Sequence, residues 1–205
     1  MKNFIEVGKT EEEQAEQVKK WIKDNTLQII IGISLGFGGI FGLNYYNQYQ
    51  HDQALKSRNY YLSIVANPNN THAIEALKTE HSGSTYVDLM TLLLAKNAVS
   101  KGDYQQALDY LMPLIDNEDE FIMHNVKLRV ASIYLEMNKP DEALSVLGNY
   151  KNKTFSTFYD DLKGDIFLVQ GKVEMAKKYY QSAFKQLHDN SKLKNLIQIK
   201  FNDLN

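Results

Sequence analysis

The chain of 205 residues contains no cysteine, only three prolines and almost no net charge. Without cysteine there is no disulfide, no thiolate zinc site and no thiol nucleophile. The lack of cysteine is compatible with an oxidising compartment. A net charge of −2 gives no basic excess of the kind that binds nucleic acid. We therefore expect no nucleic-acid partner and no cysteine chemistry.

Signatures of catalysis and of metal binding are also missing from the sequence. The histidines at positions 51, 72, 81, 124 and 188 form no ligand-spaced pair, and no HExxH, GxSxG or phosphate-binding glycine loop occurs. The carboxylates Asp160, Asp161 and Asp165 lie close together, and we expect them on a solvated helix surface. The sequence predicts no catalytic residue, no cofactor and no metal site. An enzyme would be the alternative, with Asp161 or Asp165 in its site.

One apolar run stands out in a stretch without charge. Leu27–Leu43 reads LQIIIGISLGFGGIFGL, and no charged residue lies between Asp24 and Asp52. Uncharged neighbours extend the run at both ends. A membrane-spanning helix needs about 20 predominantly apolar residues, and the extended run meets this length. We predict one transmembrane helix over residues 26–46.

Two alternatives for this run are a cleaved signal peptide and a buried core helix. A signal peptide begins with a short basic segment, whereas the segment before this run is long and includes Glu11, Glu12 and Glu13. The sequence after it, NYYNQY, offers no small-residue cleavage site. Its tyrosines and Trp21 on the other side are typical of aromatic belts at membrane interfaces. A core helix of this length seldom lacks strongly polar residues.

Basic residues near the run predict its orientation. Lys9, Lys19, Lys20 and Lys23 precede it, whereas Lys56 and Arg58 are the nearest after it. The side richer in lysine and arginine stays in the cytoplasm. Residues 1–25 are thus predicted to be a cytoplasmic tail, and residues 47–205 a periplasmic domain if the source is a bacterium.

The tail itself is predicted to contain a short amphipathic helix. Thr10 and Glu13 have capping-box spacing. Apolar residues then recur at helical spacing, beside lysines that suit the anionic headgroups of a lipid bilayer. A helix at the membrane interface is the simplest interpretation, and a regulatory tail is the alternative.

Small residues line one side of the predicted span. Gly32, Gly36 and Gly39 share a helical face, which would let another membrane helix approach closely. Because glycine is common in membrane helices, the face is a candidate packing surface only.

The rest of the chain repeats a helical pattern three times. Ala107, Ala143 and Ala176 end similar segments. Their two separations bracket the period of about 34 residues that tetratricopeptide repeats have. Small residues also stand at one fixed distance before each alanine, at Ala95, Ala131 and Gly164. We expect the two members of each small pair to face each other inside a helix hairpin.

Turn residues fall where such hairpins need them. Gly102, Asn138 and Gly171 suit the left-handed conformation that ends a first helix. Asp103 and Pro140 suit the start of a second helix. The predicted fold class is all-α, with one N-terminal transmembrane helix followed by a tetratricopeptide-like hairpin stack. The repeats are predicted at about 86–118, 121–151 and 155–188, with a C-terminal capping helix at 191–204.

The order of these parts resembles a known family over essentially the whole length. An EEEQAEQVKKWIKDN tail, a glycine-rich span, a YYNQYQ exit, a repeat domain and an IQIKFNDL ending are similar to the ancillary SecYEG translocon subunits. The resemblance implies a single-span bacterial inner-membrane protein with a periplasmic repeat domain. It also implies association with SecYEG and with the periplasmic chaperone PpiD, to assist secreted or outer-membrane proteins as they emerge.

Repeat stacks of this kind expose a concave surface that binds protein segments. The register predicts that five polar residues point toward this surface: Lys96, Asn125, Ser132, Asp161 and Asp165. The alternative is that they are ordinary solvated positions. Two further alternatives for the whole chain are a scaffold without client contact and a stress-signalling regulator acting through its tail.

Overall fold

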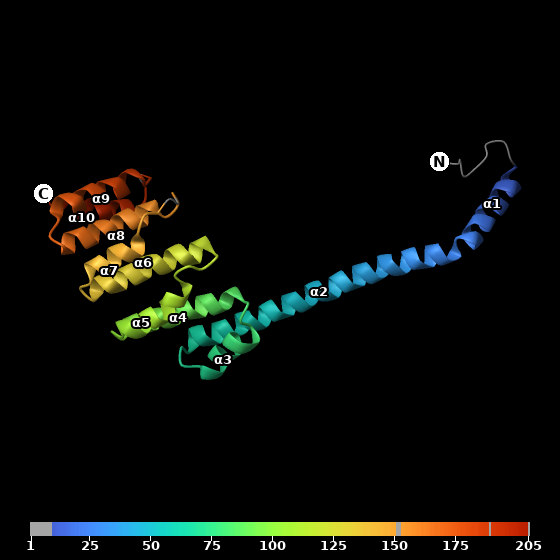
Figure 1. The fold of residues 1–205 in the computed structure, drawn as a ribbon, viewed down its shortest axis with the longest axis horizontal. Coiled ribbons are helices and arrows are strands. Elements are labelled where there is room, and N and C mark those ends of the chain that lie inside the picture. Colours follow the sequence, from blue (N-terminus) through green and yellow to red (C-terminus); the bar gives the residue numbers. More distant parts are fainter. Residues whose placement is uncertain (1–9, 151–152, 189, 205) are drawn as a thin grey trace. The chain divides into compact units, whose positions relative to one another are not determined.

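The structure is a computed structural model that describes residues 10–150, 153–188 and 190–204. Residues 1–9 of the predicted tail, among them Lys9, lie outside the described residues. So does residue 151, the predicted end of the second repeat. The chain divides into two compact units, Met1–Lys56 and Ser57–Asn205. Among the described residues the regular elements are helices (Figure 1).

The N-terminal unit begins with α1 (Glu11–Asp24). Thr10 is its N-cap residue, as predicted, but its side chain makes no capping hydrogen bond. The capping-box hydrogen bond predicted for the Thr10 side chain is therefore not formed. Three glutamates in the first turn complement the helix dipole. At the other end the Asn25 side-chain amide donates to the Trp21 carbonyl oxygen at 2.8 Å.

Helix α2 (Thr26–Ala66) contains the whole apolar run and continues beyond it. The exit residues Asn44–Tyr49 do not interrupt the helix. Large apolar side chains of the run are exposed, for example Leu35 at 72% and Phe41 at 68%. Within the described part of the chain, α2 is the one helix that is long and apolar enough to cross a membrane.

The second unit is built from helix hairpins, which Figure 1 shows in chain order. The last turns of α2 are followed by α3 (Thr71–Glu80), after a turn at Asn67–Asn70. Three hairpins come next, followed by a final helix. They are α4 (Thr85–Ser100) with α5 (Tyr104–Leu111), α6 (Glu120–Glu136) with α7 (Pro140–Leu147), α8 (Ser156–Val169) with α9 (Val173–Lys185), and α10 (Lys192–Asn202).

The predicted turn chemistry is confirmed at each hairpin. Gly102, Asn138 and Gly171 have φ angles of 79°, 57° and 72°, the left-handed region that glycine and asparagine tolerate best. The Asp103 carboxylate accepts a hydrogen bond from the Gln106 backbone N–H at 3.0 Å. Pro140 is the first residue of α7.

Proline also ends the second helix of the first hairpin. Helix α5 stops at Leu111, and a short 3₁₀ helix, η1 (Met112–Leu114), follows with Pro113 inside it. Proline lacks the N–H that a continuing α-helix would use.

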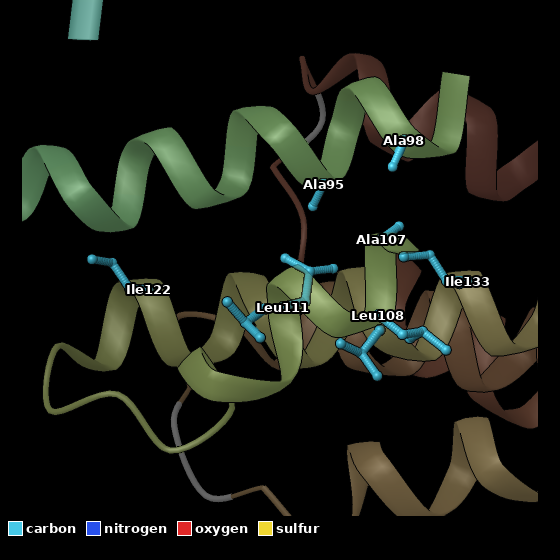
Figure 2. Close-up of a cluster of buried hydrophobic side chains, with 9 residues drawn as sticks. Ala95, Ala98, Ala107, Leu108, Leu111, Ile122 and Ile133 are labelled. Carbon is cyan, nitrogen blue, oxygen red and sulfur yellow. The ribbon is translucent and has the colours of Figure 1, made fainter. Parts of the chain in front are cut away.

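Small side chains hold the two helices of each hairpin close together. Figure 2 shows Ala95 and Ala98 pointing from α4 toward Ala107 on α5, with Leu111 beside them. All four are at most 2% exposed. Ala131 and Ala143 are likewise fully buried in one cluster of the second hairpin. The predicted pairing of small residues is thus confirmed in two hairpins.

In the third hairpin the closest neighbour of Gly164 is a large side chain. A Cβ atom added at Gly164 would clash with the ring of Tyr180. Tyr180 is 1% exposed, so its ring fills the space that the glycine leaves. The bulky partner explains why this one site needs glycine rather than alanine.

Both ends of the hairpin stack are covered by other helices of the unit. At the start, Ile64 of α2 and Leu77 of α3 are buried against Met90 of α4. At the end, α10 buries Ile197 against α9, as predicted for a capping helix. Capping elements are required because an open repeat end would leave apolar surface in water.

The tight contact at Gly164 yields a stability prediction. Gly164→Ala is expected to lower the free energy of unfolding by about 1–2 kcal/mol, because overpacking outweighs the helix propensity that alanine adds. Chemical denaturation of the full chain in detergent measures this. Gly83→Ala is the matched control, since a Cβ atom there meets nothing within 4 Å. Equal stability of the two variants would contradict the contact.

Candidate functional site

A groove lies on the second unit and is lined mainly by the first helices of the three hairpins. Its volume is about 500 Å³, and α4, α6 and α8 supply most of its walls. All five residues that the sequence predicted for the concave surface line it: Lys96, Asn125, Ser132, Asp161 and Asp165. The structure thus brings together side chains from three hairpins that are far apart in the sequence. Whether they contact a protein stays a prediction.

Apolar side chains lie among these polar ones. Phe158 of α8 is 48% exposed and lines the groove together with Leu128 and Leu162. Exposed aromatic surface in a concave site is typical of anchors for a ligand's apolar side chains. The sequence did not reveal Phe158 as a groove residue. It is an aromatic residue directly before Tyr159, which is buried, and the sequence does not show which of the two is exposed.

Two polar groups in the groove bond to their own helix. The Asn125 amide nitrogen donates to the Phe121 carbonyl oxygen at 2.9 Å, and the Ser132 hydroxyl donates to the Leu128 carbonyl oxygen at 2.9 Å. The Asn125 side-chain oxygen and the Ser132 lone pairs can then accept hydrogen bonds. Such acceptors suit the backbone N–H groups of an extended peptide.

The acidic side of the groove is already paired by the chain itself. Lys200 of α10 places its Nζ atom 2.9 Å from an Asp161 oxygen and 2.8 Å from an Asp165 oxygen. The Tyr180 hydroxyl donates to the other Asp165 oxygen at 2.7 Å. Sequence reasoning missed Lys200, because it lies 35 residues or more from both carboxylates.

Burial and pairing act in opposite directions on this cluster. Burial raises the pKa of Asp161, and the hydrogen bond and charge of Lys200 offset part of that rise. Burial alone would lower the pKa of Lys200, but hydrogen bonds to Asp165 and Asp161 outweigh it and raise this pKa. Lys200 therefore stays a cation, and it offsets one of the two negative charges beside it.

Asp160 corrects the prediction that all three aspartates lie on a solvated surface. It is 5% exposed, and its carboxylate accepts hydrogen bonds from Tyr150, Ser182 and Gln186. Burial and the bond to Asp160 raise the pKa of the Tyr150 hydroxyl. This network ties the segment before α8 and the end of α9 to α8, and so helps to place the groove wall.

A second buried polar contact fixes α8 against α6. The ring of His124 stacks on Phe155 at 4.5 Å between ring centres, and its Nδ1 atom lies 2.8 Å from the Tyr159 hydroxyl. Burial lowers the pKa of His124. Residues 10–150, 153–188 and 190–204 contain no cluster of histidine and carboxylate groups arranged to hold a metal ion.

The glycine face of α2 lies outside the groove, in the N-terminal unit. A Cβ atom at Gly32, Gly36 or Gly39 would meet nothing within 4 Å. Among the described residues no side chain covers this face, so it is open to a second helix. A packing role for the three glycines stays a prediction.

Comparison with known proteins identifies the family. Residues 19–205 match the family model of a tetratricopeptide repeat-like domain. A relative from Aggregatibacter actinomycetemcomitans named ancillary SecYEG translocon subunit is 30% identical over 95% of this chain and 97% of its own. A relative of the same name from Escherichia coli K12 is 28% identical over 98% of this chain and 99% of its own. Another from Haemophilus influenzae is 29% identical over 84% of this chain and 88% of its own. This chain belongs to the ancillary SecYEG translocon subunit family.

Membership in the ancillary SecYEG translocon subunit family agrees with both units of the structure. The family domain covers the hairpin stack. The apolar α2, together with the relatives' names as translocon subunits, suggests a single-pass protein of the inner membrane. The relatives' names describe a translocon subunit and no enzyme. No solved structure matches the chain.

The open glycine face yields a prediction about assembly in the membrane. Replacing Gly36 and Gly39 together with leucine is expected to reduce, several-fold, the membrane proteins that copurify with the full chain in mild detergent. Bulky side chains would hold a partner helix away from α2. Ser34→Leu is the control, since position 34 lies on the opposite face when a helix turns about 100° per residue. The same set and amounts of partners in both variants would eliminate the glycine face as a contact.

Proposed function

We propose that this protein is a membrane-anchored, non-enzymatic subunit that accompanies the SecYEG translocon and holds emerging chains in its groove. The observation that carries the proposal is the groove itself, in which three consecutive first helices present exposed apolar, acceptor and charged groups. Such surfaces bind extended or helical segments without changing them chemically. The names of the relatives supply the translocon as the place of action.

The charges beside the span support an orientation with the tail in the cytoplasm. Lys19, Lys20 and Lys23 precede the apolar run closely, whereas Lys56 is the first lysine or arginine after it. The excess favours retention of the N-terminal side in the cytoplasm. The repeat unit then lies in the periplasm, where secreted and outer-membrane proteins emerge.

Tethering makes weak contacts in the groove sufficient. A module fixed in the membrane near a channel exit meets emerging segments at a raised effective concentration. A groove open to solvent then needs only modest affinity, and release stays fast. A periplasmic chaperone of the PpiD type, which the family resemblance implies, would receive the segments that the groove releases.

Site-specific crosslinking tests the proposal. A photoreactive amino acid at Ser132, inside the groove, is expected to form adducts with a secreted protein stalled in translocation. The same group at Ser145 on α7, which is exposed but does not line the groove, is expected to form far fewer. Mass spectrometry identifies the adducts.

Two outcomes would contradict client binding in the groove. Equal amounts of client adducts at positions 132 and 145 would show that the client passes near the repeat unit without binding in the groove. Adducts with a chaperone alone would favour a scaffold that recruits the chaperone and never contacts the client.

A further inference from the structure

The charges of the groove are unevenly compensated. Lys200 forms ion pairs with both Asp161 and Asp165 and compensates one of their two negative charges. Lys96 of α4 and Arg129 of α6 also line the groove, and both are exposed. Neither forms an ion pair with another described residue. Three cations thus stand against two carboxylates in and beside the groove.

Arg129 of α6 shares the groove with apolar side chains. It directly follows Leu128, which lines the groove with Phe158 and Leu162. A groove that presents a guanidinium and an exposed aromatic ring suits a ligand that offers a carboxylate and a large apolar side chain. The acceptors Asn125 and Ser132 on the same helix suit the ligand's backbone.

We propose that the groove selects extended segments in which an internal aspartate or glutamate adjoins a large apolar residue. This proposal rests on the proposed function and adds its ligand chemistry. The carboxylate pairs with Arg129 and Lys96, and the apolar side chain packs on Phe158. An internal acidic residue is the source rather than a chain terminus, because helices from three successive hairpins line the groove along its length.

Lys200 gives the groove this selectivity through the two carboxylates it holds. With Lys200 in place, one of the two negative charges of Asp161 and Asp165 is compensated, so the pair repels an acidic ligand less. Without its charge, the same two groups face the groove as uncompensated anions, since like charges in a partly buried site repel. The C-terminal helix therefore acts as a positioning and charge-compensating element for a groove built by other helices.

Peptide binding to the full chain in detergent micelles tests the selectivity. Three labelled peptides of equal length, capped at both ends, carry Asp-Phe, Asn-Phe or Lys-Phe at their centre. Fluorescence anisotropy is expected to show the Asp-Phe peptide binding about tenfold more tightly than Asn-Phe, as one charge-assisted hydrogen bond provides. Lys-Phe is expected to bind most weakly, and added salt to reduce the differences.

Variants locate the effect. Arg129→Gln is expected to abolish the preference for Asp-Phe over Asn-Phe. Lys200→Met is expected to weaken Asp-Phe and strengthen Lys-Phe by several-fold each. Lys139→Gln is the control, because Lys139 is an exposed lysine in a hairpin turn away from the groove. Circular dichroism verifies the folding of each variant. If the Lys200 variant unfolds, the Arg129 variant still decides the test, because Arg129 is exposed.

The outcomes separate this inference from the function beneath it. Equal binding of all three peptides, or tighter binding of Lys-Phe, would overturn the selectivity while leaving a protein-binding groove. A requirement for a free C-terminal carboxylate would overturn the internal position of the acid. Absence of all peptide binding, together with no client adducts at position 132, would overturn the proposed function itself.

Discussion

The burial of one apolar helix segment is the constraint on which the rest of this molecule depends. Leu27–Leu43 is rich in large aliphatic and aromatic residues, and α2 exposes nearly all of them rather than packing them against the chain. Removing each such side chain from water stabilises by about 1.5–3 kcal/mol, so the run gains on the order of 20 kcal/mol in hydrocarbon. None of the described helices provides that burial, which is the state expected of a helix that spans a lipid bilayer. The repeat unit consequently works beside a membrane.

Within the repeat unit, two kinds of packing place the groove. Small side chains bring the helices of a hairpin together, as Ala95 and Ala107 do in the first hairpin. Buried polar contacts then fix the third hairpin, where the carboxylate of Asp160 and the ring of His124 each bond to neighbouring elements. The groove is therefore a surface placed by packing, while charges along it are added by exposed side chains such as Lys96 and Arg129.

The sequence predicted the features that depend on nearby residues and missed those that depend on distant ones. The left-handed turn at Asn138 and the start of α7 at Pro140 follow from local backbone chemistry, so a single segment reveals them. The pairing of Lys200 with Asp161 joins distant parts of the chain, and the packing of Tyr180 on Gly164 depends on side-chain volume across a hairpin. Periodicity placed the five groove residues on one side, but it gave no sign that Asp160, beside Asp161, turns inward.

The location of the repeat unit is tested most directly by a topology reporter on the full chain. Alkaline phosphatase, an enzyme that folds only on the exported side, is fused after Asn205, and membranes are washed with alkaline carbonate. The expected result is phosphatase activity that stays with the washed membranes. An inactive fusion that is nonetheless present, or activity released into the wash, would contradict a membrane-anchored repeat unit on the exported side.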